Sequence, residues 1–153
     1  MKKILLLTVF FSLFLIAYPK NLTVSKNKTF DAGEMTLCLP NNQPFTGTVI
    51  DGKDREFYKE GKPHGKWLCF YENKKLKSIE NWKKGNLHGK YILYSENGKK
   101  LLEAYYKNGK MNGKYKVYYE NGNPRILGKL KDGIPVGKWK KYSIDGRVTI
   151  IKK

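Results

Sequence analysis

A 24-residue repeat constrains the fold of this chain more than any other feature of its sequence. A glycine–lysine–aromatic step recurs four times at this spacing, as Gly65-Lys66-Trp67, Gly89-Lys90-Tyr91, Gly113-Lys114-Tyr115 and Gly137-Lys138-Trp139. Four residues before each step lies another glycine, at Gly61, Gly85, Gly109 and Gly133. Self-similarity at a fixed period indicates supersecondary units that stack on their neighbours, so the sequence predicts a repeat protein.

Each unit has the composition of a β-hairpin. Runs of about seven residues rich in Tyr, Trp, Ile, Leu and Val favour strands, and the frequent glycines disfavour helix. Asn97-Gly98 and Asn121-Gly122 are typical of tight hairpin turns in which both central residues take a positive φ. The Gly-x-x-x-Gly segment is expected to form the loop at the other end. Hairpins added edge to edge predict an all-β fold, an elongated single-layer twisted antiparallel sheet.

Alternation along each strand assigns the side chains to two faces of this sheet. We expect one face to be packed, with Trp67, Cys69, Tyr71, Tyr91, Leu93, Leu102, Ala104, Tyr106, Tyr115, Val117, Tyr119, Ile126, Gly128, Leu130 and Trp139. The opposite face, here named the basic aromatic face, carries the candidate ligand-binding residues Lys66, Phe70, Lys90, Tyr94, Lys114, Lys116, Tyr118, Lys138, Lys140 and Tyr142.

The charge of the chain indicates which partners this second face would attract. The 153 residues include 31 Lys+Arg and 13 Asp+Glu, for a formal net charge of +18. Such a chain favours anionic partners, namely lipid head groups, acidic polysaccharide, nucleic acid or an acidic protein. Tyrosines would add contact area and hydrogen bonds. The alternative is that the lysines only keep a one-layer sheet soluble and protect its edges.

The chain divides into three parts. Residues 1–18 have a positive start followed by an apolar run too short to span a bilayer, which is typical of a signal peptide. An uncleaved anchor is the alternative. Export predicts a location in the periplasm, cell envelope or extracellular space, and argues against a nucleic acid partner. Residues 19–43 are expected to be an N-terminal linker or cap, and 44–153 a repeat domain that opens with a shortened hairpin at Gly47.

Few side chains suggest chemistry. In an oxidising compartment Cys38 and Cys69 could form a disulfide that pins the N-terminal segment to the first repeat, or they could be two small buried hydrophobes. His64 and His88 hold equivalent places in successive units, about 10 Å apart across two strands, which is too far for one metal ion. No catalytic arrangement stands out, so we expect neither an enzyme nor a cofactor.

The repeats resemble those of bacterial MORN-variant proteins. The resemblance rests on "YKEGKPHGKWLCFYENKKLK", "WKKGNLHGKYILYSENGKKL", "YKNGKMNGKYKVYYENGNPR", "LKDGIPVGKWKKYSIDGRV" and the opening "QPFTG". It is specific for the architecture and says little about function. Some members are described as antitoxin components of toxin–antitoxin systems, so an antitoxin-like or immunity-like protein that binds one protein toxin is the alternative. The kinase name given to other members does not transfer, because this chain has no room for a kinase domain.

Two functional hypotheses follow. In the first, the chain is an exported module that binds a protein or an anionic envelope component through the basic aromatic face, with association to a membrane surface as one form. In the second, it binds a specific toxin. The exposed edges of such a sheet would also allow a homodimer.

Overall fold

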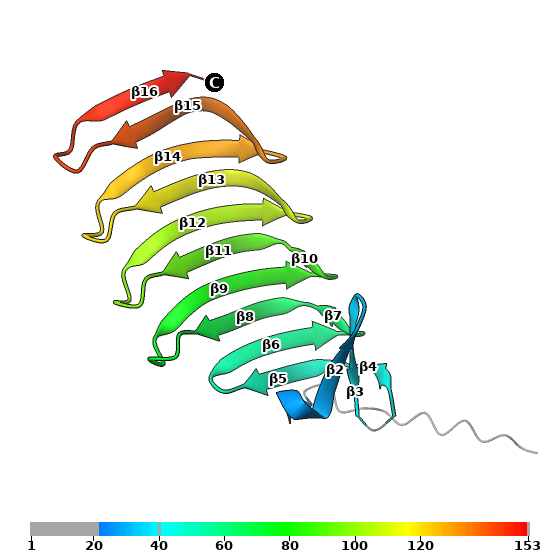
Figure 1. The fold of residues 1–153 in the computed structure, drawn as a ribbon. Coiled ribbons are helices and arrows are strands. Elements are labelled where there is room, and N and C mark those ends of the chain that lie inside the picture. Colours follow the sequence, from blue (N-terminus) through cyan, green and yellow to red (C-terminus); the bar gives the residue numbers. More distant parts are fainter. Residues whose placement is uncertain (1–21, 40, 153) are drawn as a thin grey trace, which may run out of the picture.

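The computed structural model describes residues 22–39 and 41–152, and it is built almost entirely of β-strands. The main sheet runs in the spatial order β1-β5-β6-β8-β9-β11-β12-β13-β14-β15-β16, with short β7 and β10 beside β6 and β9. All pairs in it are antiparallel except β1 with β5. Figure 1 shows one twisted layer of hairpins added in sequence order, which confirms the predicted fold class. In the described part of the chain, no helix is long and apolar enough to cross a membrane.

The elements have the following bounds: β1 (Thr23–Ser25), the 3₁₀ turn η1 (Lys26–Lys28), β2 (Thr29–Ala32), β3 (Met35–Cys38), β4 (Gln43–Pro44), β5 (Gly47–Asp51), β6 (Asp54–Lys59), β7 (Lys62–Pro63), β8 (Gly65–Phe70), β9 (Leu76–Lys83), β10 (Asn86–Leu87), β11 (Gly89–Tyr94), β12 (Lys100–Lys107), β13 (Lys110–Tyr118), β14 (Pro124–Lys131), β15 (Ile134–Tyr142) and β16 (Val148–Lys152).

The two turns of each unit have the opposite geometry to the one expected. Asn108 and Gly109 lie between paired strands and have φ values of 51° and 79°. The two-residue turn in which both central residues have a positive φ is therefore the one at Gly109, where the Gly-x-x-x-Gly segment begins. At the other end only Gly98 has a positive φ, and its N–H donates to the carbonyl of Ser95. That turn is a three-residue loop that ends in a glycine bulge. The Gly-x-x-x-Gly segment is therefore a turn followed by strand.

Successive repeats are joined by hydrogen bonds at these turns. The N–H groups of Gly85, Gly109 and Gly133 donate to carbonyls of the preceding repeat, at Pro63, Leu87 and Met111. The imidazole rings of His64 and His88 lie beside the next turn, where their Nδ1 atoms face the N–H groups of Lys84 and Asn108. The described residues contain no group of three or more side chains suited to hold a metal ion. The two histidines thus contact separate turns of the array.

The segment expected to be a linker or a cap contains short strands in its described residues, and these are named here the N-terminal cap. Strand β1 pairs with the outer edge of β5, and β2, β3 and β4 form a small separate sheet at that end (Figure 1). The buried cluster of Phe45, Val49 and Tyr58 lies here. The N–H of Thr36 donates to the carbonyl of Gly61, which ties the small sheet to the first turn of the array. The predicted signal peptide, residues 1–18, lies outside the described residues.

The two cysteines are not joined. Cys38 and Cys69 are both free and half-buried in the structure, which does not form the disulfide that is one of the two alternatives for them. Cys38 packs against the buried cluster in the cap. Cys69 lies opposite Ser78 in the main sheet, where burial raises the pKa of its thiol. Each cysteine therefore occupies a packing position in its own sheet.

Candidate functional site: two faces of one sheet

One face of the main sheet carries a ladder of aromatic rings, here named the aromatic face. Trp67, Tyr91, Tyr115 and Trp139 lie on it at the repeat spacing, and side chains from the first strand of each unit stand between them. Trp67 contacts the rings of Tyr58 and Trp82, with ring centroids 5.0 and 5.3 Å apart. Further contacts join Tyr91 to Tyr106 and Tyr115 to Trp139.

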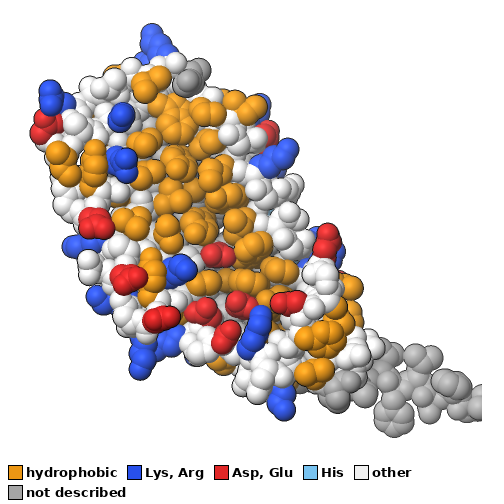
Figure 2. Space-filling model, in the orientation of Figure 1, with side chains coloured by type: hydrophobic (Ala, Val, Ile, Leu, Met, Phe, Trp, Pro, Cys, Tyr) orange, Lys and Arg blue, Asp and Glu red, His pale blue; other side chains and the backbone are white. Residues whose placement is uncertain are grey.

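The aromatic face is the one expected to be packed, and the described part of the chain leaves it open. All the rings in the ladder except Tyr58 are only half-buried, because no second layer covers them. Figure 2 shows a continuous hydrophobic stripe along the centre of this face, with lysines and arginines at its margins. The rings pack against one another, and none of the described residues forms a layer over the stripe. The expectation of a packed face is thus wrong in this respect.

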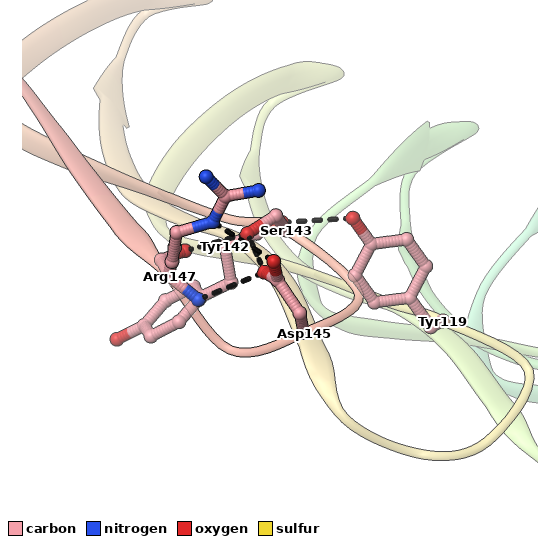
Figure 3. Close-up of polar contacts among 5 residues, drawn as sticks. All are labelled: Tyr119, Tyr142, Ser143, Asp145 and Arg147. Carbon is pink, nitrogen blue, oxygen red and sulfur yellow. Dashed lines mark hydrogen bonds and ion pairs between the residues drawn. The ribbon is translucent and has the colours of Figure 1, made fainter.

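Tyrosine hydroxyls tie neighbouring repeats together at the margin of the aromatic face. The Tyr119 hydroxyl donates to the carbonyl of Tyr142 at 2.8 Å, as drawn in Figure 3, and the Tyr71 hydroxyl makes the same bond to Tyr94. In the last turn the Arg147 Nε lies 2.8 Å from an Asp145 carboxylate oxygen. Hydrogen bonds from the Ser143 hydroxyl and the Arg147 backbone lower the pKa of Asp145. The hydroxyl groups of Tyr71 and Tyr119 thus join successive repeats, whereas the contacts of Asp145 stay within the last turn.

The strand register places the predicted ligand-binding lysines on the opposite face. Four of these lysines come directly after a glycine with a positive φ and directly before a ring of the aromatic face: Lys66, Lys90, Lys114 and Lys138. Their cross-strand neighbours are Asn81, Tyr105, Lys129 and Lys152. Phe70, Tyr94, Lys116, Tyr118, Lys140 and Tyr142 share this face by alternation. Ligand binding by these ten residues stays a prediction.

Glu103 is a residue of the basic aromatic face that the sequence analysis missed. Its side chain is buried between strands that place Ile92 and Lys116 on either side. The ammonium groups of Lys90, Lys100 and Lys116 lie 3.3, 3.2 and 3.7 Å from its carboxylate oxygens. The equivalent positions in the neighbouring units are Ile79 and Leu127, so an alignment of the repeats would have shown a charged residue in an apolar column.

Glu103 divides the predicted lysines into two groups. Lys90 and Lys116 are half-buried and paired with its carboxylate, whereas Lys66, Lys114, Lys138 and Lys140 are exposed. Burial by itself raises the pKa of Glu103, but hydrogen bonds from Lys100 and Lys90 outweigh it, so that pKa lies below its ordinary value. The four exposed lysines are those available to a ligand.

Replacement of Glu103 by leucine should preserve the fold, because Ile79 and Leu127 occupy the same place in other units. Replacement by alanine should destabilise it by about 2 kcal/mol more than leucine does, since both variants leave the three lysines unpaired but only alanine leaves a cavity. The folded-state pKa is depressed, so the ion pairs stabilise the wild type above a pH of about 4.3 and this stability is lost as pH falls further. Urea unfolding at neutral pH and at pH 3 would measure both effects; a leucine variant as unstable as the alanine variant would contradict the account.

Comparison with known proteins supports the repeat assignment. The MORN repeat variant family matches residues 63–84, 87–108 and 111–132, in register with the hairpins of the main sheet. Three tandem segments of the chain thus match this repeat family, and the hairpins on either side of them extend the same sheet. No curated protein matches the sequence. MORN repeats are generally binding modules, which agrees with two broad and accessible faces.

Proposed function

We propose that this chain is a non-enzymatic, exported binding module whose basic aromatic face binds an anionic component of the cell envelope. The ligand groups would be phosphates of lipid head groups or carboxylates of a polysaccharide, because both attract clustered ammonium groups. The proposal concerns the end of the sheet formed by β13 to β16, where the exposed lysines gather.

One observation carries this proposal. Lys114 lies directly opposite Lys129, and Lys138 directly opposite Lys152, in adjacent strand pairs of the same face. Together with Lys140 these residues are named the lysine cluster, which consists of Lys114, Lys129, Lys138, Lys140 and Lys152. All five are exposed, and none has an ion pair within the described residues. Like charges directly opposite each other destabilise a sheet. An anion bound between them would relieve that repulsion.

Aromatic side chains beside the lysine cluster suit the same ligands. Tyr118 and Tyr142 follow Lys116 and Lys140 by two residues, so they point to the same face. The ammonium group of Lys100 lies 5.9 Å from the centre of the Tyr118 ring. Such tyrosines offer contact area and a hydroxyl donor at the interface between apolar and aqueous surroundings.

Vesicle flotation with the full chain tests the proposal. We expect binding to vesicles that contain phosphatidylglycerol, no binding to pure phosphatidylcholine, and release as salt is raised, because exposed charges are screened within about 8 Å at physiological ionic strength. A parallel arm with polygalacturonate distinguishes the polysaccharide from the lipid source. Absence of binding to both anionic ligands at low salt would refute the proposal.

The antitoxin-like alternative predicts a different result in a capture experiment from envelope extract. A single protein retained at high salt, with no lipid or polysaccharide bound at low salt, would replace the anionic ligand with one specific protein partner. Long-range electrostatic attraction contributes mainly to encounter and falls steeply with salt, whereas a specific interface keeps its affinity through buried contacts.

A further inference from the structure

One position of the repeat on the aromatic face is acidic at the end next to the cap and small and uncharged at the other end. The residues at this position are Glu56, Glu80, Ala104 and Gly128, again 24 residues apart. Glu56 lies before Trp67, and the other three stand between successive rings of Trp67, Tyr91, Tyr115 and Trp139. Ala104 and Gly128 show that the architecture needs only a small side chain here. The glutamates in the first two units are therefore not explained by the fold.

Trp67 lies between these two carboxylates. It is paired with Glu80 on one side. On its other side Arg55 pairs with Leu68, so Glu56 is the next residue along and neighbours Trp67. Adjacent strands are about 4.8 Å apart, so both glutamates are cross-strand neighbours of Trp67 on the same face. Figure 2 shows acidic side chains at the lower end of the hydrophobic stripe.

Both carboxylates are held by neutral donors. The hydroxyl of Tyr58 donates to Glu56 at 2.8 Å. The Ser78 hydroxyl and the Trp82 indole N–H donate to the two oxygens of Glu80, at 3.0 and 2.9 Å. Neither glutamate has an ion pair with any described lysine or arginine. In a chain of net charge +18 these two side chains are half-buried anions that neutral donors hold in place.

The rings beside them also lack a cation. Elsewhere in the sheet the chain supplies its own: Lys77 lies over Tyr71, Lys100 over Tyr118 and Arg125 over Tyr119. No described lysine or arginine lies over the rings of Trp67 or Trp82. Tryptophan is the ring that attracts cations most strongly, and a neighbouring carboxylate adds to the attraction.

We propose that the part of the aromatic face around Trp67, named the acidic aromatic site (Glu56, Tyr58, Trp67, Glu80, Trp82), binds arginine side chains of an extended, polyproline II-like peptide segment. Guanidinium fits better than ammonium, because its plane stacks on an indole while its N–H groups bond a carboxylate in pairs. Two strand spacings separate equivalent rings, about 9.6 Å. One turn of polyproline II advances about 9.3 Å, so the same side of such a peptide meets each repeat.

The remaining rings of the ladder extend the same track. Beyond Glu80 the aromatic face continues as Tyr91, Tyr115 and Trp139 with small residues between them, which offers apolar contact to the rest of the segment. Aromatic-lined grooves are the usual recognition surface for polyproline II segments, whose stiffness lowers the entropy lost on binding. The bound arginines would lie at the end of the array next to the cap.

Fluorescence anisotropy with an Arg-Pro-Pro repeat peptide tests the site in the full chain. We expect Glu56→Gln with Glu80→Gln to weaken binding about tenfold or more, because the charge is removed. Each glutamine keeps one acceptor oxygen, for the Tyr58 hydroxyl or the Trp82 N–H, and the amide N–H at position 80 can donate to the Ser78 hydroxyl. The matched control is Glu96→Gln with Glu120→Gln, which removes the same charge from exposed turns and should leave affinity unchanged. Equal affinity in the two double variants, with both folded by thermal unfolding, would overturn the proposal.

Two further peptides fix the chemistry of the partner. A Lys-Pro-Pro repeat peptide should bind more weakly than the arginine peptide, and free arginine amide should bind far more weakly than either. Arginine amide as tight as the peptide would overturn the assignment of a peptide segment. This inference is independent of the proposed function, because the site lies on the opposite face and carries the opposite charge from the lysine cluster.

Discussion

Replacement of Gly47 by alanine should detach the N-terminal cap and lower the free energy of unfolding by about 3 kcal/mol. Gly47 has a φ of +152°, and a Cβ there would overlap the backbone carbonyl of Leu22 and lie 2.8 Å from the Phe45 ring. The Leu22 carbonyl accepts the hydrogen bond of Thr48 N–H that holds the cap to β5. The added methyl group cannot be accommodated without moving this backbone.

Urea unfolding measures this effect, and Gly52→Ala is the matched control. Gly52 also has a positive φ, 56°, but nothing lies within 4 Å of its Cβ position. It should cost about 1 kcal/mol, the strain of the backbone alone. Hydrogen exchange would locate the loss in Gly47→Ala at β1 and β5. If both variants lost the same stability, the close docking of Leu22 on Gly47 would be contradicted.

Removal of charge from the lysine cluster should abolish most binding to anionic vesicles. The variant changes Lys114, Lys138 and Lys140 to glutamine. Each lysine near an anionic surface contributes about 1 kcal/mol, so the three together predict a loss of about 100-fold in affinity. Stability should stay equal or rise, because Lys114 and Lys138 each face another lysine across the strand pair.

The matched control changes Lys53, Lys75 and Lys99 to glutamine. These three are exposed in turns at the margin of the sheet, so the net charge falls by the same amount without touching the lysine cluster. Flotation at several salt concentrations compares the two variants with the wild type. A parallel loss in both would show that only the net charge matters, and would refute a localised binding face.

The sequence was sufficient to predict the hairpin array because its repeat is regular and its alternation is clear. The lysines at 66, 90, 114 and 138 share one face for the same reason. Sequence reasoning assigns the two turn types to the wrong ends of the hairpins. Asn97-Gly98 and Asn108-Gly109 are the same dipeptide, and only the strand pairing reveals which turn has two residues. The cap could not be predicted as a sheet, since β2, β3 and β4 have no repeated pattern.

The sequence predicts on which face a side chain lies better than it predicts which charged side chains pair with one another. Alternation assigns Lys90 and Lys116 to the basic aromatic face, but it does not show that they meet Glu103 from the two strands on either side of it. The open aromatic face has a similar origin. Alternation gives an apolar face, and whether another layer covers it depends on residues outside the repeat.

A sheet of one layer has no common interior, so each hairpin depends on the one before it. The buried cluster lies at the cap, whereas every residue of β16 is exposed and Ile150 and Ile151 retain 58 % and 42 % of their surface. Nearest-neighbour stabilisation of this kind makes opening sequential. Amide protons should therefore exchange fastest in β16 and progressively more slowly toward β5. Unfolding would begin at the hairpin of β15 and β16. The lysine cluster would then lie on the part of the sheet that opens most readily.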